Sequence, residues 1–144
     1  MKKNKVPLLI GISIVVLFIL LGVLINLGSS EDIESKTTDR WVQETKEGKV
    51  VTVVGLTTCS HCQAYKPNII SLAKKKGFNL YFFELDTLSE EDRKIVMDTY
   101  SLDYEGSVPY TFIMDKGSFI SSKTGYSNMT SIESFLKDNG ILEN

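Results

Sequence analysis

The sequence predicts an α/β fold, a three-layer α/β/α sandwich with a mixed central sheet, preceded by one N-terminal transmembrane helix. Three observations support this prediction. The chain carries no charged residue from Val6 to Ser30. Beyond this stretch, short β-branched and apolar runs alternate with segments of helical length, which is the pattern of a sheet covered by helices. Two runs near the C-terminus are separated only by Asp115-Lys116-Gly117, a turn sequence that joins antiparallel strands.

The apolar stretch Val6–Leu27 is long enough to cross a membrane. As a helix it reaches about 33 Å, and the hydrocarbon core of a bilayer is roughly 30 Å thick. A cleaved signal peptide is the alternative. Its apolar region is normally about 7–15 residues long and ends in a small-residue site of the A-x-A kind. Here the run is longer and leaves through Asn26-Leu27-Gly28-Ser29-Ser30, so an uncleaved anchor is favoured.

Charge on the two sides of this stretch predicts its orientation. Lys2, Lys3 and Lys5 precede it and acidic residues follow it, so the positive-inside rule places residues 29–144 outside the cytoplasm. We therefore expect a single-pass protein of the cell membrane with an extracytoplasmic C-terminal domain. After those three lysines, 13 of the 16 basic side chains remain against 18 acidic ones, a net charge of −5. This charge argues against a nucleic-acid partner.

The chain divides into three parts on this basis. Residues 1–28 form the cytoplasmic start and transmembrane anchor, residues 29–37 a polar linker, and residues 38–144 the folded domain. Ile33 is expected to lie in a weak edge strand. Helices are predicted over 38–47, 60–76, 87–101 and 130–140, and strands over 50–56, 80–85, 108–114 and 118–122.

Local signals set the ends of these elements. Gly48 and Gly77 stop the first two helices, the second of them as a C′ residue. Thr87 and Thr130 each precede a glutamate by three residues, the spacing of a capping box. The strand–helix–strand order predicts parallel pairing of the first three strands through right-handed crossovers. The final hairpin adds an antiparallel edge.

The only cysteines of the chain lie in the sequence Cys59-Ser60-His61-Cys62, where a predicted buried strand ends and a helix begins. N–H groups at a helix start stabilise negative charge, which favours the reactive thiolate form of Cys59. His61 can add a positive charge when protonated and so tune the redox potential. The spacing brings the sulfurs close enough for a disulfide. Cys59 would attack a substrate disulfide and Cys62 would resolve the mixed disulfide.

Three other roles for the cysteine pair are less well supported by the sequence. A structural disulfide remains an alternative, but one that closes so short a loop restricts the unfolded chain little. A zinc site needs four ligands, and only the two cysteines and the sole histidine are available as ligands here. A c-type haem needs a histidine directly after the second cysteine, where this chain has Gln63. We expect no metal and no cofactor other than the redox-active disulfide itself.

From about residue 33 to the C-terminus the sequence resembles the thioredoxin-like family. The C-x-x-C motif at a strand–helix junction carries this resemblance, together with the terminal hairpin and helix. Pro67, five residues after Cys62, stands where the family often has a helix-kinking proline. Val108-Pro109 opens a strand and matches the family's cis-proline. A looser similarity is to small anchored thioredoxin-like accessory proteins of Gram-positive bacteria, including those found beside bacteriocin genes.

The resemblance implies that Pro109 is cis and lies against the cysteines. It also implies that the Val108 backbone pairs with an extended substrate chain. Tyr104 and Tyr110 flank this proline and are candidates for the substrate surface.

The sequence also departs from the thioredoxins proper. Thr58 replaces the tryptophan that usually precedes the first cysteine, and Ser60-His61 replaces Gly-Pro. Val53 occupies the position of a buried acid thought to help proton transfer, so Glu84 or Asp86 is a candidate for that role. The histidine resembles that of oxidising and isomerising members of the family.

These observations predict a thiol–disulfide oxidoreductase that acts on cysteines of exported proteins. A membrane or extracytoplasmic redox partner would reset it. The direction of electron flow stays open, although the histidine and the exported location favour oxidation. The alternative is a non-catalytic tethered binding module, or a transporter accessory protein, whose cysteines are incidental.

Overall fold

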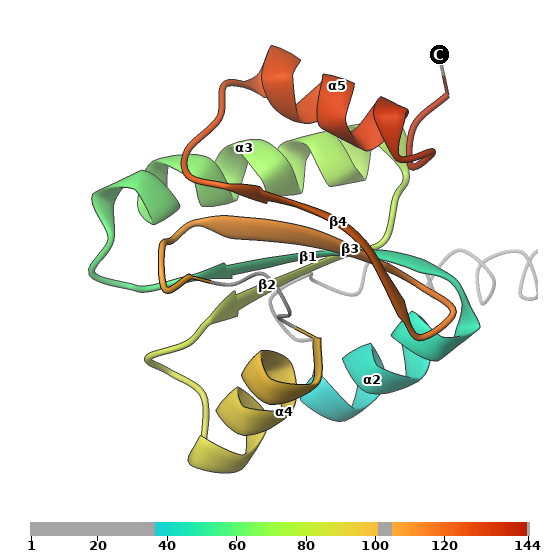
Figure 1. The fold of residues 1–144 in the computed structure, drawn as a ribbon. Helices are drawn as coiled ribbons and strands as arrows, with labels where there is room; N and C mark the ends of the chain where they lie inside the picture. The colour runs from blue at the N-terminus through green and yellow to red at the C-terminus, as the bar shows by residue number, and fades with distance from the viewer. Residues whose placement is uncertain (1–36, 101–104, 144) are drawn as a thin grey trace, which may run out of the picture. The chain divides into compact units, whose positions relative to one another are not determined.

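A computed structural model describes residues 37–100 and 105–143 of the chain (Figure 1). The predicted membrane span, the predicted linker as far as residue 36, Ile33 within it and Tyr104 lie outside these residues. Within the described part, no helix is long and apolar enough to cross a membrane.

A mixed sheet of four strands in the order β2-β1-β3-β4 forms the centre of the domain (Figure 1). The strands are β1 (Lys49–Gly55), β2 (Leu80–Glu84), β3 (Tyr110–Asp115) and β4 (Ser118–Thr124). Strands β1 and β2 are parallel, with Gly55 opposite Glu84, and β3 runs antiparallel to both of its neighbours. All of β1 except Lys49 is buried, as expected for an unbroken apolar strand in the middle of a sheet.

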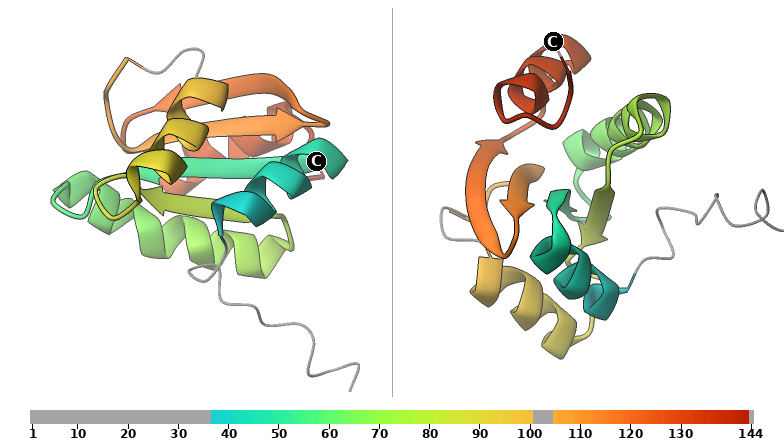
Figure 2. Two further views of the ribbon diagram at one scale, coloured as in Figure 1. Left: turned by 90° about the horizontal axis from the view of Figure 1, so that it is seen from below. Right: turned by 90° about the vertical axis from the view of Figure 1, so that its right-hand side faces the viewer.

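Helices cover both faces of the sheet (Figures 1 and 2). Helices α3 (Ser60–Lys76) and α5 (Met129–Asp138) lie on one face. Helices α2 (Thr38–Glu47) and α4 (Glu90–Tyr100) lie on the other. The predicted α/β fold with a mixed central sheet is therefore confirmed.

Each face of the sheet has its own apolar core. On the α2 and α4 side, the buried Trp41 packs edge-on against Phe83 and Phe112, with ring centroids 5.5 and 6.3 Å away. Its indole N–H donates to Thr52 Oγ1 at 2.8 Å. The other core joins α3 and α5 to the sheet through Tyr65, Ile69, Leu72, Ile132 and Leu136. These contacts hold the start of α3, and with it the cysteines, in place on the sheet.

The pairing predicted for β3 is wrong. The order of elements predicted that β3 runs parallel to β1, but the two strands are antiparallel, with Tyr110 opposite Val54. In a parallel pair, the connection must return the chain to the end of the sheet at which the first strand begins. Here the connection through α4 leaves the chain at the end of the sheet at which β1 finishes. As a result, Pro109 lies next to the segment that links β1 to Cys59.

The predicted N-caps of α4 and α5 are also wrong. In α4 the cap is Ser89, whose Oγ accepts the backbone N–H of Asp92 at 3.0 Å. The Thr87 hydroxyl instead donates to a backbone carbonyl of the preceding turn. In α5 the cap is Asn128 rather than Thr130, and its Oδ1 accepts a backbone N–H three residues on. Several good capping side chains stand close together at both starts, so spacing alone does not decide between them.

Candidate active site

Cys59 is the N-cap of α3, at the end of the loop that follows β1. Its backbone is extended, and its Sγ accepts a hydrogen bond from the backbone N–H of Cys62 at 3.1 Å. Both cysteines are free thiols. Cysteine here takes the place of the usual Ser, Thr, Asp or Asn cap. A donor aimed at the sulfur stabilises the negative charge of a thiolate, which is the form that attacks disulfides.

The two cysteines differ in exposure. Cys62 is only 2% exposed, whereas Cys59 is partly exposed. Burial, and after it the hydrogen bond with Cys59, raises the pKa of the Cys62 thiol from 9.0 to about 11. A substrate can therefore reach Cys59 first, while Cys62 stays protonated behind it. The roles predicted from the sequence, Cys59 as nucleophile and Cys62 as resolving thiol, stay predictions.

Gly55, the last residue of β1, lets the start of α3 approach the sheet. A Cβ at this position would lie 3.2 Å from the Cβ of Cys62 and 3.3 Å from its Sγ. It would also lie 3.3 Å from the ring of Phe82. Contacts between carbon atoms are normally about 3.5–4.0 Å. The absence of a side chain at residue 55 thus makes the space in which the Cys62 thiol is buried.

The turn before β3 completes the surroundings of Cys59. The Val108–Pro109 peptide bond is cis, the geometry that the resemblance implies. The Cys59 Sγ lies 3.9 Å from the carbonyl oxygen of Val108. Pro109 is buried, and its carbonyl accepts the N–H of Gly125 at 2.8 Å. The start of α3 and the turn before β3 therefore meet at the Cys59 sulfur, and the bond from Gly125 ties this turn to the residue after β4.

A carboxylate outside the cysteine motif holds the loop that leads to Cys59. Asp86 accepts the backbone N–H of Thr57 with both carboxylate oxygens, at 3.0 and 3.1 Å, and also accepts the Thr57 hydroxyl. The Gln63 side chain donates to the Thr57 carbonyl from the first turn of α3. The hydrogen bonds from Thr57 lower the pKa of the Asp86 carboxyl. Asp86 remains ionised at neutral pH and anchors the loop two residues before Cys59.

His61 lies on the exposed side of the first turn of α3 and contacts an aromatic residue from another element. Its ring centroid is 6.0 Å from that of Tyr126, with 36° between the ring planes. Tyr126 belongs to the loop between β4 and α5 and is 48% exposed. It also meets the ring of Tyr65 edge-on, with centroids 6.2 Å apart. His61 is therefore held on one side by a ring that the cysteine motif itself does not reveal.

The side chain of Tyr110 lies away from the surface. It is fully buried on the α2 and α4 side of the sheet, 5.7 Å from Phe112 between ring centroids. Val108, by contrast, is partly exposed. A contact of Tyr110 with substrate would have to come from its backbone, while Val108 can offer both backbone and side chain.

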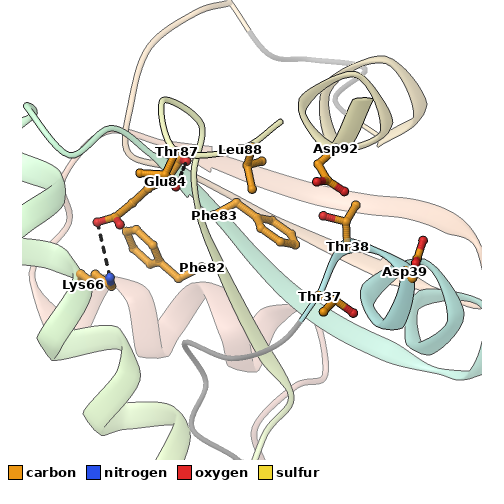
Figure 3. Close-up of a pocket in the computed structure, with 10 residues that line it drawn as sticks. All are labelled: Thr37, Thr38, Asp39, Lys66, Phe82, Phe83, Glu84, Thr87, Leu88 and Asp92. Carbon is orange, nitrogen blue, oxygen red and sulfur yellow. Dashed lines mark hydrogen bonds and ion pairs between the residues drawn. The ribbon is translucent and has the colours of Figure 1, made fainter. Parts of the chain in front are cut away.

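The two proposed proton-relay carboxylates have other partners. Asp86 binds Thr57, as described above. Glu84 pairs with Lys66 Nζ at 3.4 Å, and this nitrogen also lies 5.5 Å from the centre of the Phe82 ring (Figure 3). The pair lies at the rim of a polar hollow of about 600 Å³ along β2 and the starts of α2 and α4. The side chains that line this hollow do not include either cysteine.

Sequence reasoning overlooked three contributors to this site. The glycine at the end of β1 was a usable signal, because glycine in a strand often marks a close approach of another backbone or side chain. The hydrogen bonds between Thr57 and Asp86 and the ring contact of Tyr126 had no such signal, since each joins segments that are distant in the sequence. Among the described residues, no group of three His, Cys, Asp or Glu side chains is placed to hold a metal ion.

Comparison with solved structures supports the fold. No model of a protein family and no curated protein matches the chain significantly. Thioredoxin f2 of Chlamydomonas reinhardtii superposes with a TM-score of 0.60 at 12% identity, over 75% of this chain and 96% of that protein. Thioredoxin of Schistosoma mansoni gives 0.54 at 20% identity, over 70% and 88%. Thioredoxin O2 of Arabidopsis thaliana gives 0.54 at 14% identity, over 72% and 89%.

These identities are low, so the likeness concerns the fold. The described residues have a thioredoxin-like fold, with a C-x-x-C pair at the start of α3 that is suited to thiol–disulfide exchange.

Proposed function

We propose that the protein is a membrane-anchored thiol–disulfide oxidoreductase that acts on cysteines of exported proteins. The observation that carries the proposal is the asymmetry of the cysteine pair. Cys59 is partly exposed and receives an N–H donor at the helix start, whereas Cys62 lies behind it, buried and protonated. A purely structural disulfide would not require this difference between the two sulfurs.

The chemistry follows from this asymmetry. In the reducing direction, the Cys59 thiolate attacks one sulfur of a substrate disulfide, and the other substrate sulfur leaves as a thiolate. Cys62 then gives its proton to the substrate thiolate that left first and attacks the Cys59 Sγ, which releases the second substrate sulfur as a thiolate. The substrate gains two electrons, and the protein is left with a Cys59–Cys62 disulfide. In the oxidising direction the same steps run in reverse, and a substrate dithiol becomes a disulfide.

The cellular setting is part of the proposal. The apolar stretch Val6–Leu27, with lysines before it and acidic residues after it, supports an anchor with the folded domain outside the cytoplasm. Disulfides form and persist in that compartment. Its substrates would then be exported proteins with cysteines, and a membrane or extracytoplasmic thiol protein would reset the Cys59–Cys62 pair.

Insulin reduction by the full chain, purified in detergent, tests the activity. We expect turnover by the wild type and none by Cys59→Ser. Cys62→Ser should form a mixed disulfide with the substrate that persists, because no resolving thiol is present. Equal and negligible activity of wild type and Cys59→Ser, with no trapped species in Cys62→Ser, would refute the proposal and favour a tethered binding module.

The reduction potential of the Cys59–Cys62 pair tests the direction of electron flow. We favour oxidation, because a protonated His61 beside the thiolate would stabilise the reduced form. A potential near that of DsbA, about −120 mV, would support this direction, and one near that of thioredoxin, about −270 mV, would refute it.

A further inference from the structure

The ring of Tyr126 is the far end of a chain of contacts that begins inside the sheet. Tyr65 of α3 is 1% exposed, and its hydroxyl is 3.1 Å from Thr111 Oγ1 of β3. The edge-on contact with Tyr65 fixes one side of Tyr126, and the bond from the Gly125 N–H to the Pro109 carbonyl fixes the backbone beside it. Tyr126 is therefore held from two directions although almost half of it is exposed.

Among the described residues, the Tyr126 ring is the one aromatic contact of His61. His61 projects from the exposed side of the first turn of α3, where a side chain is otherwise free to change rotamer. The 6.0 Å contact with Tyr126 has the tilted geometry of an attractive aromatic pair. When the imidazole is charged, the face of the tyrosine ring attracts it further. His61, one of the two residues between the cysteines, is thus placed by a side chain 65 positions later in the sequence.

We propose that Tyr126 is a positioning residue that holds His61 in place and, through it, sets the redox potential of the Cys59–Cys62 pair. The redox part of this inference rests on the proposed function; the positioning part does not. The electrostatic attraction between a cation and a nearby thiolate weakens as the distance between them grows. Fixing the imidazole therefore fixes its effect on the stability of the reduced form.

The positioning is tested by NMR of the full chain in detergent micelles. His61 is the only histidine, so its ring protons give a signal without competitors. In the wild type, we expect the ring current of Tyr126 to displace the chemical shifts of the His61 ring protons. This displacement should be lost in Tyr126→Ala. It should be retained in Tyr126→Phe, because the ring and not the hydroxyl makes the contact. Ile120→Ala is the matched control, because Ile120 is similarly exposed, at 44%, and lies toward the other end of β4. An identical His61 signal in wild type and Tyr126→Ala would overturn the proposal.

The effect of Tyr126 on the redox potential of the Cys59–Cys62 pair is tested by a double-mutant cycle in glutathione buffers. Tyr126→Ala should change the equilibrium constant with glutathione about two- to fivefold, or about 9–21 mV, in the same direction as His61→Ala. In the His61→Ala background it should have no effect. The redox part would be overturned if Tyr126→Ala had the same effect in the wild-type and His61→Ala backgrounds. It would also be overturned if His61→Ala by itself had the same equilibrium constant as the wild type. A wild type that does not exchange with glutathione at all would instead refute the proposed function, and the NMR result would still stand.

Discussion

Replacement of Gly55 by alanine is expected to destabilise the domain by displacing the resolving cysteine. The added methyl carbon would meet the Cβ and Sγ of Cys62 and the ring of Phe82, all at 3.2–3.3 Å. Each contact is a few tenths of an ångström too short, so these groups must move. Overpacking a buried site by one methyl group typically costs about 1–3 kcal/mol.

A second term partly offsets this cost. Alanine restricts the unfolded chain more than glycine does, and this stabilises a protein by about 0.4–1 kcal/mol where the native backbone accepts it. The strand conformation at residue 55 accepts alanine, so the middles of these two ranges leave a net loss of about 1–2 kcal/mol. For a domain of roughly 100 residues this lowers the unfolding midpoint by about 4–16 °C.

The assay compares Gly55→Ala with Gly48→Ala by thermal unfolding of the reduced full chain. Gly48 is the matched control, because its backbone is extended and a Cβ there would meet nothing within 4 Å. We expect Gly48→Ala to be as stable as the wild type or slightly more stable. Gly55→Ala should also prolong the lifetime of a mixed disulfide between Cys59 and substrate, because Cys62 is the group that shifts. Equal stability of the two variants would refute the packing argument.

Three further predictions concern stability and reactivity. Thr52→Val removes the hydroxyl that accepts the Trp41 indole N–H. We expect chemical denaturation to show a free energy of unfolding lower by about 1–3 kcal/mol. An unchanged unfolding curve would contradict the role of this bond. The raised pKa of Cys62 means that folding favours its protonated form, so this contribution is complete below about pH 9 and is lost as pH rises toward 11. The reduced wild type should therefore lose stability over that interval relative to Cys62→Ser, and parallel pH profiles of the two would count against it. Asp86→Ala frees the loop before Cys59 and should slow its reaction with a disulfide by up to about tenfold in stopped-flow measurements, whereas an unaltered rate would show that the loop needs no such anchor.

Local patterns predicted the elements of this fold well, because their signals are carried by neighbouring residues. The apolar β-branched run of β1 identified a central strand, and its last residues led directly to the C-x-x-C motif. Gly77 has the left-handed conformation (φ 74°) of a helix stop, as predicted. The caps of α4 and α5 were predicted at the wrong residues, because several capping side chains compete within one turn.

The sequence by itself determined the strands and helices, the two cysteines and their position at a helix start, because each depends on residues within a turn or two. Tertiary structure decided the antiparallel direction of β3 and the arrival of Val108 beside Cys59. It also decided that the Cys62 thiol lies over Gly55 and that His61 rests against Tyr126. The pairing of β3, the approach of Val108 to Cys59 and the contact of His61 with Tyr126 join segments far apart in the chain, and the position of Cys62 over Gly55 depends on how α3 packs on the sheet.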